Sequence, residues 1–181
     1  MRKLLPALTI VNLIATAELR QPVELEKLVH VDGFLYDTAI YRCAYLKDRN
    51  MKSKISIFST GKMISVGSKS IQTAKHDLHY TSRRLAELGL ITPKRITVKL
   101  QNIVATSSLG RSIRLENLSA RLPQTIYEPG QFPGAIHYAK ELEGASILIF
   151  ANGKVVFAGL RRLDLLDTAK QVLMQLAEQN T

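Results

Sequence analysis

The apolar positions of the chain form strand-like runs and helix-like stripes, and each pattern occurs twice. Apolar runs around residues 8–17 and 97–107 predict β-strands. Each run is followed by a short segment with helical spacing, which we expect to begin near Pro22 in one place and near Ser112 in the other. The order of elements is therefore the same at the two places.

Hairpins and longer helices complete both parts. Small turn residues separate apolar segments at Ser59, Thr60 and Gly61, and again at Asn152 and Gly153, which predicts β-hairpins because these residues tolerate positive φ. An amphipathic helix follows each hairpin, and Gly89 is the expected C-cap of the first. Their apolar stripes are Ile71, Ala74, Leu78, Leu85 and Leu88 in the first helix, and Leu165, Ala169, Val172, Leu173 and Leu176 in the second.

These parts are internal repeats. IVNLIATAEL at 10–19 matches LQNIVATSSL at 100–109 with a shift of 90 residues. The shift becomes 91 where Tyr41 meets Phe132, and 92 where ISIFSTGKMISVG at 55–67 meets ILIFANGKVVFAG at 147–159. We therefore expect a first repeat over 1–92 and a second over 93–181, with one extra residue in each of two connections of the second.

Five strands and two one-sided helices per repeat predict an α+β protein in which helices cover one face of an antiparallel sheet. Strand residues alternate between faces, so some apolar strand side chains must lie on the uncovered face. These candidates are Val11, Leu13, Ile57, Met63, Val104 and Val156. An apolar sheet face without a cover requires a partner, and a homodimer of the free protein is one open alternative.

Charge favours a polyanionic partner. The chain carries 25 Lys and Arg against 15 Asp and Glu, a formal net charge of +10. Residues 1–91 hold 14 basic and 8 acidic side chains and residues 92–181 hold 11 and 7, so both repeats are basic. A solvated surface is the alternative interpretation of such charge.

The reactive residue types do not predict an enzyme. Cys43 is the single cysteine, and His30, His76, His79 and His137 are scattered without zinc-ligand spacing. We find no Ser/His/Asp set and no phosphate-binding loop, so we expect no catalysis, no metal ion and no cofactor. No segment has 18 uninterrupted apolar residues, and we expect an intracellular, DNA-associated protein.

At this point the chain resembles the TATA-binding protein family, from about Leu8 to Glu178. QNIVATSSL, YEPGQFPG at 127–134 and ILIFANGKVV at 147–156 carry the likeness in the second repeat, and IVNLIATAEL and ISIFSTGKMISVGSK at 55–69 carry it in the first. The resemblance implies a pseudo-twofold saddle whose concave ten-stranded sheet binds the DNA minor groove, with helices on the convex face. The family is itself a standard example of groove binders that kink DNA with apolar wedges.

The resemblance implies four wedge side chains: Phe132 and Phe150 in the second repeat, and Phe58 and Tyr41 in the first. Core packing is the usual alternative for a strand Phe. Arg42 and Cys43 replace the Pro and Gly that the second repeat keeps as Pro133 and Gly134. A different alignment would place Tyr36 at the wedge, but it needs a deletion and an insertion, so we prefer Tyr41.

Base contacts are implied for Asn12 and Asn102, whose amides can donate to adenine N3 and thymine O2. Val66 and Ala158 stand where the family usually has a base-contacting Thr, so two hydroxyl contacts are missing.

Phosphate contacts are implied for a set of basic residues, and Tyr138 replaces a further family arginine. The set is Lys62, Lys69, Lys154 and Arg161, with Lys47 a weaker candidate.

The resemblance also implies partners. Tyr127, Glu128 and Gln131 match the loop through which the family engages a IIB-type transcription factor and, with it, the RNA polymerase machinery. We expect a general initiation factor that bends A·T-rich promoter DNA, of the archaeal type and hence cytoplasmic; a eukaryotic member would be nuclear. A divergent paralogue acting mainly as a protein-interaction platform, with altered DNA preference, is the second hypothesis.

Overall fold

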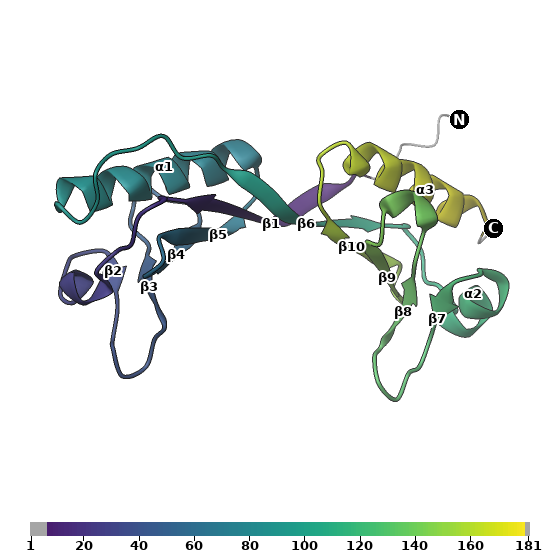
Figure 1. Cartoon of the computed structure of the whole chain (residues 1–181). Helices are drawn as coiled ribbons and strands as arrows, with labels where there is room; N and C mark the ends of the chain where they lie inside the picture. Colours follow the sequence, from purple (N-terminus) through teal and green to yellow (C-terminus); the bar gives the residue numbers. More distant parts are fainter. Residues whose placement is uncertain (1–6, 180–181) are drawn as a thin grey trace. The chain divides into compact units, whose positions relative to one another are not determined.

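The computed structural model describes residues 7–179 (Figure 1). Within these residues the same series occurs twice, a strand, a short helix, four strands and a long helix, and the second series has an additional short helix, η2. They are β1 (Thr9–Glu18), η1 (Leu25–Leu28), β2 (Phe34–Leu35), β3 (Cys43–Leu46), β4 (Lys54–Phe58), β5 (Lys62–Ser68), α1 (Ile71–Glu87), β6 (Lys99–Ser108), α2 (Leu115–Arg121), β7 (Thr125–Ile126), β8 (Gly134–His137), η2 (Lys140–Leu142), β9 (Ser146–Phe150), β10 (Lys154–Leu160) and α3 (Leu165–Gln179).

The strands form a ten-stranded sheet in the order β2-β3-β4-β5-β1-β6-β10-β9-β8-β7. The chain divides into two compact units, one of Asn12–Gln101 and one of the described parts of Met1–Val11 and Asn102–Thr181. Within the units, strands run β1-β5-β4-β3-β2 and β6-β10-β9-β8-β7, which is the same order. The predicted antiparallel α+β architecture is confirmed. The repeat boundary between residues 92 and 93 stays a prediction.

Strand registers follow the shifts found in the sequence. In the hairpins, Ile57 pairs with Met63 and Ile149 pairs with Val155, a shift of 92 on both strands. Next to them, Cys43 pairs with Phe58 and Gly134 pairs with Phe150. The extra residue of the second repeat in this region therefore lies in the β8–β9 connection, which also contains η2.

The two short helices begin three residues later than predicted, at Leu25 and Leu115. The residues before them are held extended by the hairpin turns. Val23 donates its backbone N–H to the carbonyl of Ser59, and Ile113 donates to the carbonyl of Ala151. Strand-like bonds thus replace the first helical turn that the spacing predicted.

The longer helices cover one sheet face within each unit, α1 against β4 and β5 and α3 against β10 (Figure 1). All five predicted core residues of α3 are buried. In α1, Ala74, Leu78 and Leu85 are buried, but Leu88 is 39% exposed, so its placement on the buried face was wrong. The C-cap is Leu88, one residue before the predicted Gly89, and Gly89 follows it with φ +70°.

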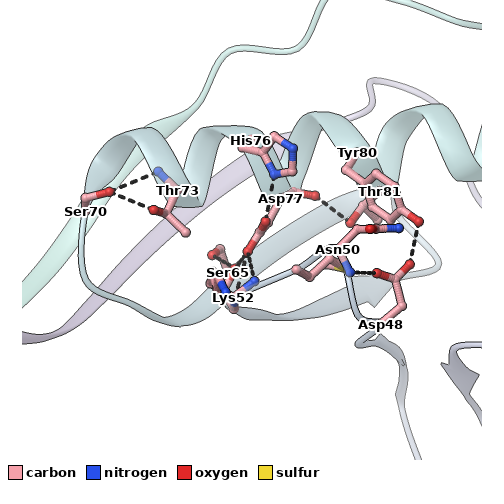
Figure 2. Close-up of polar contacts among 12 residues, drawn as sticks. Asp48, Asn50, Lys52, Ser65, Ser70, Thr73, His76, Asp77, Tyr80 and Thr81 are labelled. Atoms are coloured by element: carbon pink, nitrogen blue, oxygen red, sulfur yellow. Dashed lines mark hydrogen bonds and ion pairs between the residues drawn. The ribbon is translucent and has the colours of Figure 1, made fainter.

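A polar cluster fixes α1 to the β3–β4 loop (Figure 2). The fully buried Asp77 accepts hydrogen bonds from the backbone N–H of Lys52 and from both the N–H and the hydroxyl of Ser53. Ser65 of β5 donates to the Ser53 hydroxyl at 2.9 Å. In the second repeat the matching positions are Ala145, Phe157 and Ala169, all buried, so an aromatic ring there takes the place of a polar network.

The Asp77 carboxylate is held ionised by this cluster. Burial raises its pKa, but the hydrogen bonds from Ser53, His76 and the Lys52 backbone outweigh burial, and the pKa lies below the usual value.

None of the helices between residues 7 and 179 is long and apolar enough to cross a membrane.

Candidate nucleic-acid interface

The sheet face opposite the helices, called the open face below, carries alternate residues of each strand. In β1 the exposed or half-buried positions are Asn12, Ile14 and Thr16, whereas Leu13, Ala15 and Ala17 are buried beneath the helices. Among the apolar candidates, Val104 and Val156 lie on the open face, and Leu13, Ile57 and Met63 lie in the core. Val11 is exposed, but it alternates with Asn12 and therefore lies on the same face as Leu13, near the start of β1.

Asn12 and Asn102 occupy equivalent sites, each beside a β-bulge. The Oδ1 atom of Asn12 accepts the backbone N–H of Gly67 at 2.9 Å, and that of Asn102 accepts the N–H of Gly159 at 3.1 Å. A backbone N–H can only donate, so this bond fixes which end of each amide faces the glycine. The Nδ2 group of each asparagine is therefore left to donate elsewhere.

The bulges themselves depend on glycine. Strand pairing skips Gly67 between Ser68 and Val66, and it skips Gly159 between Leu160 and Ala158. Their φ angles of +97° and +94° lie where side chains are disfavoured. Each bulge aims its N–H at the neighbouring asparagine, so sequence and backbone conformation together orient the amide.

The positions beside the bulges are apolar. Val66 is 39% exposed and Ala158 is half-buried, and both lie on the open face. Val66 is the Cα partner of Ile14, and Ala158 is the Cα partner of Val104. Neither side chain can form a hydrogen bond, so the surface beside each asparagine is apolar.

Phe132 and Phe150 form a ring pair in the second repeat. Their centroids lie 5.8 Å apart at an interplanar angle of 61°, and both rings are half-buried. Gly134 lies beneath them, and a Cβ there would come within 2.9 Å of Phe132 Cε1 and 3.2 Å of Phe150 Cε1. The absent side chain leaves room for the rings.

The first repeat differs at this point because Cys43 occupies the place of Gly134. Its side chain is buried, and the ring of Tyr41 packs edge-on against Tyr45, with centroids 5.5 Å apart, instead of pairing with Phe58 as Phe132 pairs with Phe150. Tyr41 nevertheless matches Phe132 in backbone position. The backbone carbonyl of Asp37 accepts the N–H groups of Ile40 and Tyr41, and that of Glu128 accepts the N–H groups of Gln131 and Phe132. This equivalence favours the alignment with Tyr41 over the one with Tyr36.

Tyr45 and Lys54 are open-face residues that the sequence analysis did not select. The Lys54 ammonium lies 3.8 Å from the centroid of the Tyr45 ring. A hydrogen bond with Cys43 raises the pKa of Tyr45, so the phenol stays neutral. The repeat alignment could have found both, because it sets Tyr45 over Ile136 and Lys54 over Ser146.

The candidate phosphate-binding side chains are exposed, but they are not equivalent. Lys62 is the Cα partner of Glu18 on β1, whereas Lys154 is the Cα partner of Ser108. Lys69 and Arg161 are also exposed. Lys47 donates to the carbonyls of Met51, Lys52 and Ser53, so this ammonium already stabilises the β3–β4 loop.

The candidate partner loop of the second repeat is a compact turn. Glu128 and Gln131 are exposed and Tyr127 is half-buried. Two hydrogen bonds to the Glu128 carbonyl, at 2.9 and 3.0 Å, connect the turn to Phe132. The carboxylate of Glu128 therefore lies on the same short exposed segment that positions the Phe132 ring.

His137, one of the scattered histidines, is buried on β8 and hydrogen-bonded to Thr125 at 3.0 Å. Burial lowers its pKa, which keeps it neutral. Over residues 7–179, His, Cys, Asp and Glu side chains form no group of three that could hold a metal ion.

The fold and the open face define a sheet protein of two repeats, each with helices on one face of its strands and, on the other face, apolar side chains beside an asparagine amide. A family model described as "Transcription factor TFIID (or TATA-binding protein, TBP)" matches residues 7–88 and 97–179. The chain therefore belongs to the TATA-binding protein family.

Individual relatives are archaeal. The TATA-box-binding protein of Cenarchaeum symbiosum (strain A) is 38% identical over 157 residues, covering 86% of this chain and 85% of that protein. The TATA-box-binding protein of Methanosphaera stadtmanae is 32% identical over 84% of both chains. The solved structure of Methanococcus jannaschii TBP is 26% identical, covers 96% of this chain and 99% of its own, and has a TM-score of 0.83. The expected archaeal type and fold family are confirmed.

Proposed function

We propose that this protein is a general transcription initiation factor that binds A·T-rich promoter DNA through the minor groove, bends it and recruits a IIB-type factor. Each repeat, residues 1–92 and 93–181, contributes one half of the DNA-binding surface. The observation that carries the proposal is the pair of asparagine amides, Asn12 and Asn102, fixed by bulge glycines with their donor groups free.

The free donors match the chemistry of A·T pairs. Both A·T and T·A expose only the acceptors adenine N3 and thymine O2 in the minor groove, whereas G·C adds the guanine N2 amino donor. An amide Nδ2 group satisfies the acceptors in either orientation and offers nothing to the N2 amino group. Leaving that amino group buried and unpaired costs about 1 to 3 kcal/mol.

Wedging at the ends of the site is assigned to the aromatic rings. Phe132 and Phe150 form a half-buried pair that can enter a base step as one apolar unit. Unstacking a step costs a few kcal/mol, which is offset when the kinked duplex contacts more of the sheet. Phe58 and Tyr41 are the corresponding side chains of the first repeat, with the altered packing caused by Cys43.

Basic side chains supply attraction that is independent of sequence. We assign phosphate contacts to Lys62, Lys69, Lys154 and Arg161, which are exposed. Lys47 is assigned a lesser part because its ammonium is already bound to loop carbonyls. The net charge of +10 favours binding to duplex DNA as a whole.

Recruitment of the IIB-type factor is assigned to the turn of Tyr127, Glu128 and Gln131. The exposed carboxylate of Glu128 suits a basic partner surface. The same turn is hydrogen-bonded to Phe132, so partner binding and the DNA wedge share a support.

The testing experiment is a gel-shift titration with an A·T-rich and a G·C-rich duplex of equal length, with and without a IIB-type factor. We expect the A·T-rich duplex to be bound at least about tenfold more tightly, as one unpaired buried donor predicts. The factor should form a ternary complex on that duplex only. Equal binding of both duplexes would refute the minor-groove assignment.

A further inference from the structure

The open faces of the two repeats differ chemically along one row of paired residues. In the first repeat the row runs Thr16, Ile64, Ser56 and Tyr45 across β1, β5, β4 and β3. In the second repeat the equivalent row runs Thr106, Val156, Leu148 and Ile136. The first two positions of each row are alike. The last two carry hydroxyl groups in the first repeat, Ser56 and Tyr45, and only hydrocarbon in the second, Leu148 and Ile136.

The first repeat holds these hydroxyls in a defined cluster. Tyr45 is the Cα partner of Ser56, so their side chains are neighbours on the open face. The Tyr45 ring is contacted by the ring of Tyr41 and by the ammonium of Lys54. Contacts on two sides restrict the rotation of the ring and so position its hydroxyl. We call Tyr45, Lys54 and Ser56 the polar cluster of the first repeat.

A hydroxyl differs from a hydrocarbon in how it meets a G·C pair. It can donate to the acceptors that every base pair presents in the minor groove, and it can accept from the guanine N2 amino group. Leu148 and Ile136 can do neither, so they leave that amino group unpaired. Replacing A·T by G·C should therefore be costly opposite the second repeat and nearly neutral opposite the polar cluster.

We propose that the polar cluster makes the first repeat tolerant of G·C pairs, so that the protein prefers asymmetric sites with A·T pairs under the second repeat and mixed pairs under the first. This inference rests on the minor-groove function proposed above. Asymmetry of the site then fixes which way round the protein lies on DNA. The direction is set by Tyr45 and Ser56, and Lys54 adds attraction without discrimination because its donors suit both kinds of pair.

The test uses three versions of one pseudo-symmetric A·T site: unchanged, with a G·C pair away from the centre in one half, and with such a pair in both halves. The parent protein should bind the first two alike, because it can place its first repeat on the substituted half. Substitution in both halves should weaken binding about tenfold or more. Inosine in place of guanine, which lacks the N2 amino group, should restore the loss.

Exchanging these residues between the repeats should exchange their tolerance of G·C pairs. Ser56→Leu with Tyr45→Ile gives the first repeat the residues of the second, and it should lose tolerance of the one-sided G·C site. Leu148→Ser with Ile136→Tyr should gain tolerance of the two-sided site. Lys54→Ser should weaken binding to all three sites by the same factor. These positions are half-buried or exposed, and an unchanged melting temperature confirms folding.

The outcomes separate this inference from the proposed function. If the unchanged A·T site is bound and a one-sided G·C pair already costs the parent tenfold, the polar cluster does not confer tolerance and the inference is wrong. The same holds if Ser56→Leu with Tyr45→Ile tolerates G·C like the parent. If no version of the site is bound above random DNA, the proposed function fails and the inference fails with it.

Discussion

Asn12 uses its side-chain carbonyl oxygen to accept the backbone N–H of Gly67 at 2.9 Å. The same bond joins Asn102 to Gly159 at 3.1 Å. In both cases the glycine is the extra residue of a bulge. The bulge therefore consumes the acceptor end of the amide and leaves the donor end for the partner, which is the basis of the A·T preference proposed here.

Replacing Asn12 or Asn102 by Asp should abolish this preference without disturbing the fold. The carboxylate can still accept the glycine N–H, but it presents an acceptor and a negative charge where the amide presented a donor. We expect affinity for A·T-rich DNA to fall about tenfold or more, in line with losing one hydrogen bond and leaving a base acceptor unpaired. Gel-shift titration measures the affinity.

Asn117→Asp is the matched control for these variants. It makes the same charge change on the exposed surface of α2. If it weakens DNA binding as much as Asn12→Asp and Asn102→Asp do, general charge repulsion explains the loss and the specific role of the two asparagines is wrong.

Phe132→Ala and Phe150→Ala should reduce both affinity and bend angle. Each variant breaks the ring pair over Gly134, so the cost of unstacking is no longer offset by wider sheet contact. Tyr41→Ala should have a smaller effect, because Tyr41 packs on Tyr45 and not on Phe58. Fluorescence transfer between dyes on the duplex ends measures the bend. Parent-like bending by all three variants would place these rings outside the mechanism.

Glu128→Lys should weaken the ternary complex with a IIB-type factor and leave binary DNA binding intact. The side chain is exposed, and the turn is held by the carbonyl of residue 128, which the substitution keeps. Gel shifts with and without the factor measure the two steps separately. Equal losses in both would mean that the turn acts only by supporting Phe132.

Asp77→Ala should destabilise the protein by about 3 kcal/mol, because the buried N–H and hydroxyl of Ser53 and the part-buried N–H of Lys52 lose their acceptor. Asp77→Asn keeps one acceptor oxygen and should cost less. Urea unfolding at pH 7 measures both values. Ala74→Ser, at another buried position of α1, is a control for disturbing the helix interface.

The pH dependence of this effect has a defined sign. The folded-state pKa of Asp77 is lowered, so its contribution is fully present above the unfolded value of about 3.9 and is lost as the pH falls through the folded pKa. The stability difference between the parent and Asp77→Asn should therefore shrink below about pH 4. A difference that grows on acidification would contradict the assigned ionisation.

Much of the fold could be predicted because the repeat supplies each element twice. The Asn-Gly turn of the second hairpin identifies the weaker Ser-Thr-Gly turn of the first, and both form the same register. The α1–loop cluster could not be predicted, because Asp77, Ser53 and Ser65 are distant in sequence and are ordinary surface residue types. Their burial depends on how the β3–β4 loop folds against the helix.

The interface was predicted unevenly for a similar reason. Equivalent positions gave Asn12 and Asn102, which lie on the matching strands β1 and β6. They also gave Phe132, which lies just before β8, and Phe150, which lies at the end of β9. The packing of Tyr41 on Tyr45 depends on Cys43, whose side chain fills the space that the Phe132 and Phe150 rings occupy above Gly134. A pairwise match of motifs does not contain that information. Lys47 was carried over by position from the family resemblance as a weaker candidate, and its ammonium is bound to carbonyls of its own loop.

The most direct test of minor-groove binding replaces every A·T pair of a bound site by inosine·cytosine. This exchange changes the major-groove pattern but keeps the minor groove free of the guanine amino group. The protein should bind the inosine duplex within about threefold of the A·T duplex, which corresponds to a difference below 1 kcal/mol, and should bind the matching all-G·C duplex at least tenfold more weakly, the cost of one unpaired donor at about 1.4 kcal/mol. If the inosine duplex is bound as weakly as the all-G·C duplex, the open face does not read the minor groove.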